Sequence, residues 1–138
     1  MAIDLTQTHD LFTSDAAYRF PEAKQLLTPA LLIYPERVEA NIEAMIRVLD
    51  GQVDRWRPHI KTTKLEFVMR RLVEKGVTHF KCATTLELVT ACRAGAKDLL
   101  VAYPVVGPNA RRVREIIGEY PDIHFAVLVE NPLQVETW

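Results

Sequence analysis

The chain is organised around the basic segment Arg57-Pro58-His59-Ile60-Lys61-Thr62-Thr63-Lys64. Side chains alternate between the two faces of an extended strand. If residues 56–61 are extended, one face carries Arg57, His59 and Lys61, and the other is formed by the residues between them. Three nitrogen-bearing side chains on one face of a strand are unusual in a hydrophobic core. The direction in which this polar face points therefore decides what the protein can do.

Segments with strand and helix patterns alternate on both sides of this segment. Short apolar runs predict strands at residues 28–34, 56–61, 79–84, 98–103 and 124–131. Apolar residues at helical spacing, bounded by Gly, Pro or capping residues, predict helices at about residues 35–49, 65–75, 84–95 and 107–120, and another begins at Pro132. Thr84 and Glu87 have the spacing of a capping box. Strands that alternate with helices indicate right-handed crossovers and a parallel sheet.

Two α/β architectures fit this alternation: an open doubly wound sheet, or part of a (β/α)8 barrel. A doubly wound sheet that binds a nucleotide usually has a glycine-rich first βα turn, but residues 61–64 contain no glycine. A complete TIM barrel needs about 250 residues, whereas the chain has 138. We therefore expect an N-terminal arm at residues 1–27 and a truncated barrel, about its first half, at residues 28–138.

The composition is typical of a soluble globular protein, with 49% hydrophobic and 25% charged residues. The net charge of −1 gives no basic field for nucleic acid or an anionic membrane. No apolar run approaches the ~20 residues of a membrane span, and no secretory signal is visible, so we expect a cytoplasmic protein. Cys82 and Cys92 lack zinc-ligand spacing and are expected to be reduced thiols. No metal site is predicted within the chain.

Functional residues of barrels and open sheets lie at the carboxyl ends of the strands. Here those ends carry Lys61, Thr84, Thr85, Tyr103, Glu130 and Asn131. If the polar face points inward, burial and the neighbouring Arg57 charge would lower the pKa of Lys61. The neutral amine is the form that condenses with a carbonyl compound. If the face points outward, the same residues form a solvated basic stripe, and spacing alone leaves both possibilities open.

Residues 57–64 resemble the R-P-H-x-K-T-x-K signature of the D-threonine aldolase and D-serine dehydratase-like family. These are pyridoxal-phosphate enzymes with a barrel of the alanine racemase N-terminal type. Thr28-Pro29-Ala30-Leu31 resembles the family's opening T-P-x-L, and residues 100–107, Leu-Val-Ala-Tyr-Pro-Val-Val-Gly, resemble its third-strand segment. The resemblance extends over about residues 28–131. The chain departs from the family at Thr63, where the family often has histidine.

The resemblance implies a role for several of these residues. Lys61 would bind pyridoxal 5'-phosphate covalently and act as an acid/base group at the substrate α-carbon. His59 would contact the cofactor or tune Lys61, although a hydrogen-bonded core histidine is an equal alternative. Arg57 would anchor the barrel floor through carboxylates, and Lys64 would be a solvated lysine at the start of a helix. A divalent metal, Mn or Zn, is expected only in a missing C-terminal part, and the full-length protein is expected to be a homodimer.

The expected function is that of a lyase acting on D-3-hydroxy amino acids, of the aldolase or the dehydratase type, present here as a fragment that binds cofactor weakly and is inactive. One alternative is a non-catalytic pyridoxal-phosphate carrier with the same barrel. Another is a cofactor-free scaffold in which Lys61 is an ordinary strand-end lysine.

Overall fold

The computed structural model describes Tyr18 and residues 21–138, so the expected arm at residues 1–27 lies mostly outside the described residues. The three strands are β1 (His79–Cys82), β2 (Asp98–Val101) and β3 (His124–Val127). The α-helices are α2 (Pro35–Val48), α3 (Glu66–Glu74), α4 (Thr85–Ala94), α5 (Pro108–Glu119) and α6 (Pro132–Thr137), and short 3-10 helices occur at η2 (Pro21–Gln25) and η3 (Val53–Arg55).

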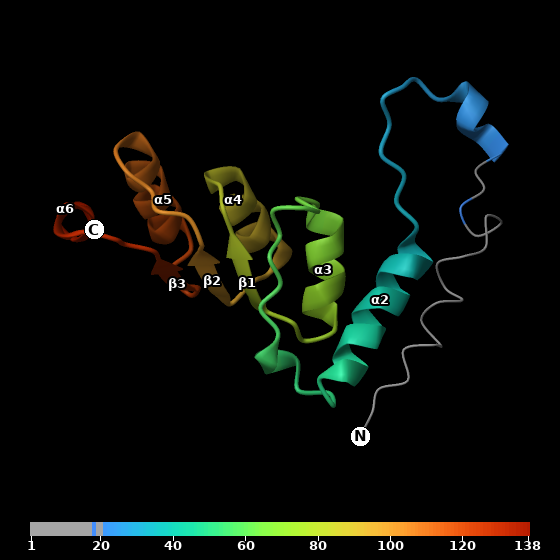
Figure 1. The fold of residues 1–138 in the computed structure, drawn as a ribbon, viewed down its shortest axis with the longest axis horizontal. Helices are drawn as coiled ribbons and strands as arrows, with labels where there is room; N and C mark the ends of the chain where they lie inside the picture. Colours follow the sequence, from blue (N-terminus) through green and yellow to red (C-terminus); the bar gives the residue numbers. More distant parts are fainter. Residues whose placement is uncertain (1–17, 19–20) are drawn as a thin grey trace.

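The strands form one parallel sheet in the order β1-β2-β3, as the alternation of strands and helices predicts. Alternate residues of β1 and β2 are fully buried in a core that is shared with α3, α4 and α5: Phe80, Cys82, Leu99 and Val101. The residues between them lie on the opposite face and are half-exposed. Helices α2, α3, α4 and α5 stand side by side in a row (Figure 1), with each helix contacting the next.

The prediction of an α/β fold is confirmed, but no closed barrel is present in the described part of the chain. The predicted strand at residues 28–34 is not formed, and Leu31, Leu32 and Ile33 within it are exposed. A strand requires a hydrogen-bonded neighbour, and the described residues provide none beside this segment. The three observed strands are also shorter at their carboxyl ends than predicted, because their last residues belong to the following loops.

The predicted strand at residues 56–61 is reduced to one parallel bridge between His59 and Lys81. The N–H of Lys81 donates to the carbonyl of Pro58, and the N–H of Ile60 donates to the carbonyl of Lys81, each at 3.0 Å. After Ile60 the chain turns, and the N–H of Lys64 donates to the carbonyl of Ile60 at 2.9 Å. Lys61 therefore lies in a turn and not at the end of a regular strand.

The helices begin and end close to their predicted bounds, because their signals are local. Pro35 and Pro108 are the first residues of α2 and α5, where a proline needs no N–H partner. The Oγ1 of Thr84 accepts a hydrogen bond from the N–H of Glu87 at the start of α4, as a capping box requires. Gly95 ends α4 with φ 98°, a left-handed conformation that glycine adopts without strain.

The cysteines agree with the prediction of reduced thiols. Cys82 and Cys92 are both free and buried, and burial raises their pKa values to about 12 and about 11. Across the described residues, no helix has the length and apolar character needed to cross a membrane. The same part of the chain contains no group of three or more His, Cys, Asp or Glu residues that could hold a metal.

Candidate functional site at the carboxyl ends of the strands

Lys61 lies in the turn that follows the His59–Lys81 bridge, beside the carboxyl end of β1. Its side chain is exposed, and its backbone N–H donates to Nδ1 of His59 at 3.3 Å. The pKa of His59 lies below its usual value, because of burial first and then the positive charges of Lys61 and Lys81. A neutral ring with an accepting Nδ1 carries its proton on Nε2. His59 thus supports the backbone of the turn as a neutral imidazole.

Arg57 belongs to the opposite end of the sheet. Its Nη1 lies 2.5 Å from Oδ1 of Asp98, the first residue of β2, and also donates to the carbonyl of Phe80 at 3.3 Å. The expectation that Arg57 anchors the floor through carboxylates is therefore confirmed. The inward orientation would have placed the Arg57 charge beside Lys61, but the guanidinium instead pairs with the Asp98 carboxylate.

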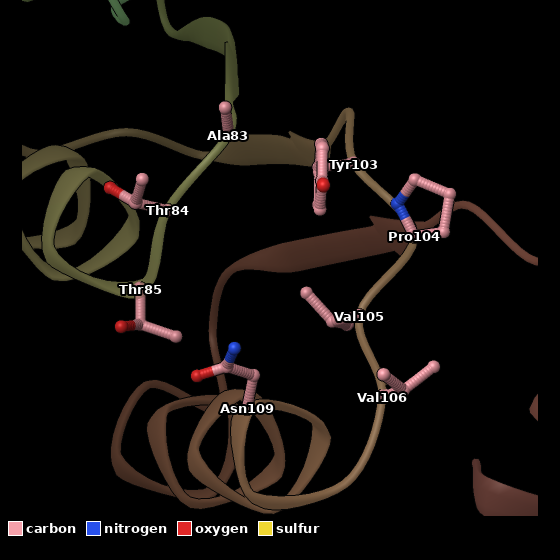
Figure 2. Close-up of a pocket in the computed structure, with 8 residues that line it drawn as sticks. All are labelled: Ala83, Thr84, Thr85, Tyr103, Pro104, Val105, Val106 and Asn109. Atoms are coloured by element: carbon pink, nitrogen blue, oxygen red, sulfur yellow. The ribbon is translucent and has the colours of Figure 1, made fainter.

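Loops at the carboxyl ends of β1 and β2 border an open pocket of about 480 Å³. Thr84 and Thr85 lie on one side of it and the loop of residues 103–106 on the other, while Asn109 extends from the first turn of α5 between them (Figure 2). Hydroxyl and amide groups thus meet an apolar wall of Pro104, Val105 and Val106. Such a mixture is typical of sites for small ligands.

The pocket brings together three of the strand-end residues that the sequence indicates: Thr84, Thr85 and Tyr103. Two others have structural roles at the start of α6. The side chain of Asn131 accepts a hydrogen bond from the N–H of Gln134 at 3.1 Å, and the N–H of Glu130 donates to Oε1 of Gln134 at 2.6 Å. Asn109 was not predicted from the sequence, although the preceding Gly107-Pro108 places it at the start of a helix.

A second hollow, of about 470 Å³, borders the turn that carries Lys61, although Lys61 itself lines neither hollow. Its lining includes His59, Thr62 and Thr63, and apolar side chains of α2 and α3 complete it. The segment that carries Lys61 is therefore hydrogen-bonded to β1 and also borders this apolar hollow.

Lys64 contacts a buried carboxylate at the end of the same turn. Its Nζ lies 3.3 Å from Oε1 of Glu87, a residue of α4 that is 2% exposed. Lys64 is exposed, as expected, but it also pairs with Glu87, and α3 begins two residues later than expected, at Glu66. The sequence identified Glu87 as half of a capping box but gave no sign of this ion pair.

Comparison with known proteins supports the resemblance drawn from the motif. The sequence matches no protein-family model. Over 75 residues, which are 54% of this chain and 20% of the relative, it is 35% identical to D-threo-3-hydroxyaspartate dehydratase from Delftia sp. (strain HT23). The structure matches the crystal structure of D-threonine aldolase from Filomicrobium marinum with a TM-score of 0.69 and 22% sequence identity, over 83% of this chain and 30% of that chain.

The second match shows the fold alone, because the sequence identity is low. The chain spans only 20% of the dehydratase and 30% of the aldolase. Its three parallel strands and their helices therefore correspond to part of the aldolase fold. The chain is thus similar, over part of its length, to D-threo-3-hydroxyaspartate dehydratase and to D-threonine aldolase.

Proposed function

We propose that the chain is part of a pyridoxal-phosphate-dependent lyase that acts on D-3-hydroxy amino acids, and that Lys61 binds the cofactor. The position of Lys61 after the bridge to β1 carries the proposal. Lys61 lies in a turn beside the carboxyl end of β1, and the loop that leaves β1 lines the pocket of Figure 2. Lys61 itself does not line this pocket, and its side chain is exposed, so the burial expected for an inward-pointing polar face is not found. The similarity to a dehydratase whose named substrate is a 3-hydroxy amino acid supports it.

Pyridoxal phosphate combines an aldehyde, an aromatic ring and a phosphate, and the turn and the pocket would hold different parts of it. Among the residues that the structure describes, the pocket lining contains no basic side chain for the phosphate. Lys61 supplies the amine that attaches the aldehyde. Thr85, Tyr103 and Asn109 offer neutral hydrogen-bond donors for oxygen atoms of the cofactor or the substrate. The bound cofactor supplies an electron sink for the substrate α-carbon.

The remaining chemistry belongs to side chains of this chain. Lys61 Nζ is the group that moves the proton at the substrate α-carbon. His59 accepts the Lys61 N–H through Nδ1 and so orients the turn without carrying a charge. Retro-aldol cleavage would give glycine and an aldehyde, and β-elimination of water would give a keto acid and ammonia. Because the relative found by sequence is a dehydratase, β-elimination is the first reaction to assay.

Covalent trapping tests the proposal. The purified chain is incubated with pyridoxal phosphate, reduced with borohydride and digested, and the pyridoxyl group is located by mass spectrometry. We expect it on Lys61. Lys61→Ala should abolish this adduct, whereas Lys97→Ala, which removes another exposed lysine, should leave it unchanged.

Adducts spread over the lysines according to their exposure would contradict the proposal and favour a cofactor-free scaffold. A specific adduct without turnover by the full-length protein would favour a carrier. The turnover assay uses D-threonine, D-serine and D-threo-3-hydroxyaspartate, each with and without Mn²⁺ or Zn²⁺.

A further inference from the structure

We propose that Glu87 is a positioning residue for Lys61: its buried carboxylate holds the ammonium group of Lys64 and thereby fixes the turn that presents Lys61. This inference rests on the proposed function, because it concerns the residue that would attach the cofactor. Glu87 and Lys64 are 23 residues apart in the sequence; Glu87 lies in α4, and Lys64 lies in the loop before α3.

The Glu87 carboxylate is held rigidly before it reaches Lys64. Its Oε2 accepts a hydrogen bond from the N–H of Ala83 at 2.8 Å. The backbone N–H of Glu87 donates to Oγ1 of Thr84 at 3.2 Å, which fixes the residue at the start of α4. The residue is 2% exposed. Burial alone would raise the pKa of Glu87, but the Ala83 N–H and Lys64 outweigh this effect and keep the pKa below its usual value. The carboxylate is therefore a fixed negative charge at the start of α4.

The turn of residues 60–64 is fixed at both ends. At its start, the buried side chain of Ile60 enters the core and its N–H donates to the carbonyl of Lys81 at 3.0 Å. At its end, Lys64 donates its N–H to Ile60 at 2.9 Å and adopts φ 54°. That left-handed conformation is unfavourable for a residue with a Cβ atom. The ion pair with Glu87 offsets this unfavourable backbone conformation, because it fixes the Lys64 side chain on α4.

Lys61 lies between these two attachments. Its own side chain is exposed, so its direction depends on the backbone of the turn. If Lys64 loses its partner, the end of the turn is released, and the Lys61 amine samples more positions. A displacement of about 1 Å at a reacting group can lower a rate by about a hundredfold. The ion pair thus acts on Lys61 through the backbone and not through contact with the amine.

Three variants separate the charge of Lys64 from its conformation. Lys64→Met removes the charge and keeps a long side chain. Lys64→Gly removes the charge and also relieves the strain of the positive φ. Lys64→Arg keeps the charge. The probe is pyridoxal phosphate with borohydride trapping, and the measured quantity is the ratio of the adduct at Lys61 to the adduct at the exposed Lys97 of the same molecules.

We expect Lys64→Met and Lys64→Gly to lower this ratio by about tenfold and Lys64→Arg to retain it. Glu87→Gln, which keeps an acceptor for the Ala83 N–H, should behave as Lys64→Met does. Circular dichroism establishes that each variant is folded. If Glu87→Gln does not fold, the Lys64 variants carry the test, because the Lys64 side chain is 58% exposed. An unchanged ratio in folded Lys64→Met, or a normal ratio in Lys64→Gly, would overturn the inference.

A second measurement separates this inference from the proposed function. Hydrogen exchange of the Lys64 amide reports the turn without any cofactor, and we expect it to accelerate in Lys64→Met and not in Lys64→Arg. Suppose that pyridoxal phosphate shows no preference for Lys61 in the unaltered chain, but exchange of the Lys64 amide accelerates in Lys64→Met. The proposed function then fails, while the ion pair still fixes the turn. If pyridoxal phosphate prefers Lys61 but exchange of the Lys64 amide is unchanged in Lys64→Met, the role of Glu87 is refuted and the proposed function stands.

Discussion

Arg57 and Asp98 connect the polar segment to the first residue of β2, across the intervening strand β1. The two residues are 41 positions apart in the sequence, and Nη1 of Arg57 lies 2.5 Å from Oδ1 of Asp98. The same guanidinium nitrogen donates to the carbonyl of Phe80 in β1 at 3.3 Å. One side chain therefore contacts two strands and holds the segment before Lys61 against the sheet.

We expect Arg57→Ala to lower the free energy of unfolding by about 1 kcal/mol, because the ion pair is partly exposed and therefore partly screened. The Arg57→Lys variant keeps a charge but loses the planar group that reaches Asp98 and Phe80 together, so it should recover only part of the loss. Urea denaturation measures both changes. Equal stability of Arg57→Ala and the unaltered chain would contradict this role.

The same pair predicts a dependence of stability on pH. The hydrogen bond from Arg57 outweighs burial and keeps the pKa of Asp98 below its usual value of 3.8. Because the carboxylate binds protons more weakly in the folded state, its contribution is complete above pH 3.8 and is lost as the pH falls through the folded-state pKa. Below about pH 4, we expect the free energy of unfolding of the unaltered chain to fall more steeply with pH than that of Asp98→Asn. The variant lacks the carboxyl group that titrates. Parallel slopes would contradict the prediction.

Two glycines should respond to alanine in opposite directions. Gly95 has φ 98°, and an added Cβ would lie 3.4 Å from Cγ1 of Val73, so Gly95→Ala should cost about 1–2 kcal/mol of stability. Gly118 lies within α5, where an added Cβ meets nothing within 4 Å, and Gly118→Ala should stabilise by about 0.5–1 kcal/mol. Thermal unfolding of both variants checks the pair. A stabilised Gly95→Ala would show that the turn after α4 relaxes without cost.

The sequence predicts the helices well because their signals are contained within a few residues. Pro35, Thr84, Gly95 and Pro108 each specify a helix end by their own conformation or hydrogen bonding. The strand predicted at residues 28–34 fails for the opposite reason, since a strand depends on a partner that local sequence does not identify. The segment at residues 56–61 keeps only one bridge, because Pro58 has no N–H to donate.

The candidate site, like the fold, was predicted in part from the sequence. The strand-end rule identifies six residues, and the structure places three of them, Thr84, Thr85 and Tyr103, around one pocket. Lys61, Glu130 and Asn131 do not line it. The ion pair between Lys64 and Glu87 could not be predicted, because it depends on a turn with a positive φ at a lysine. Such a conformation follows from the packing of Ile60 and α4 and leaves no mark in the sequence.

One end of the sheet stabilises the fold and the other carries the pocket, and this separation has an evolutionary consequence. The Arg57–Asp98 pair secures the framework at one end, while the residues of the pocket lie on loops at the other. Exposed loop residues such as Tyr103 and Val106 can therefore be substituted while the framework stays intact, whereas Val105 belongs to the buried core. Descendants of one ancestral scaffold can diversify in this way by exchanging a few loop residues.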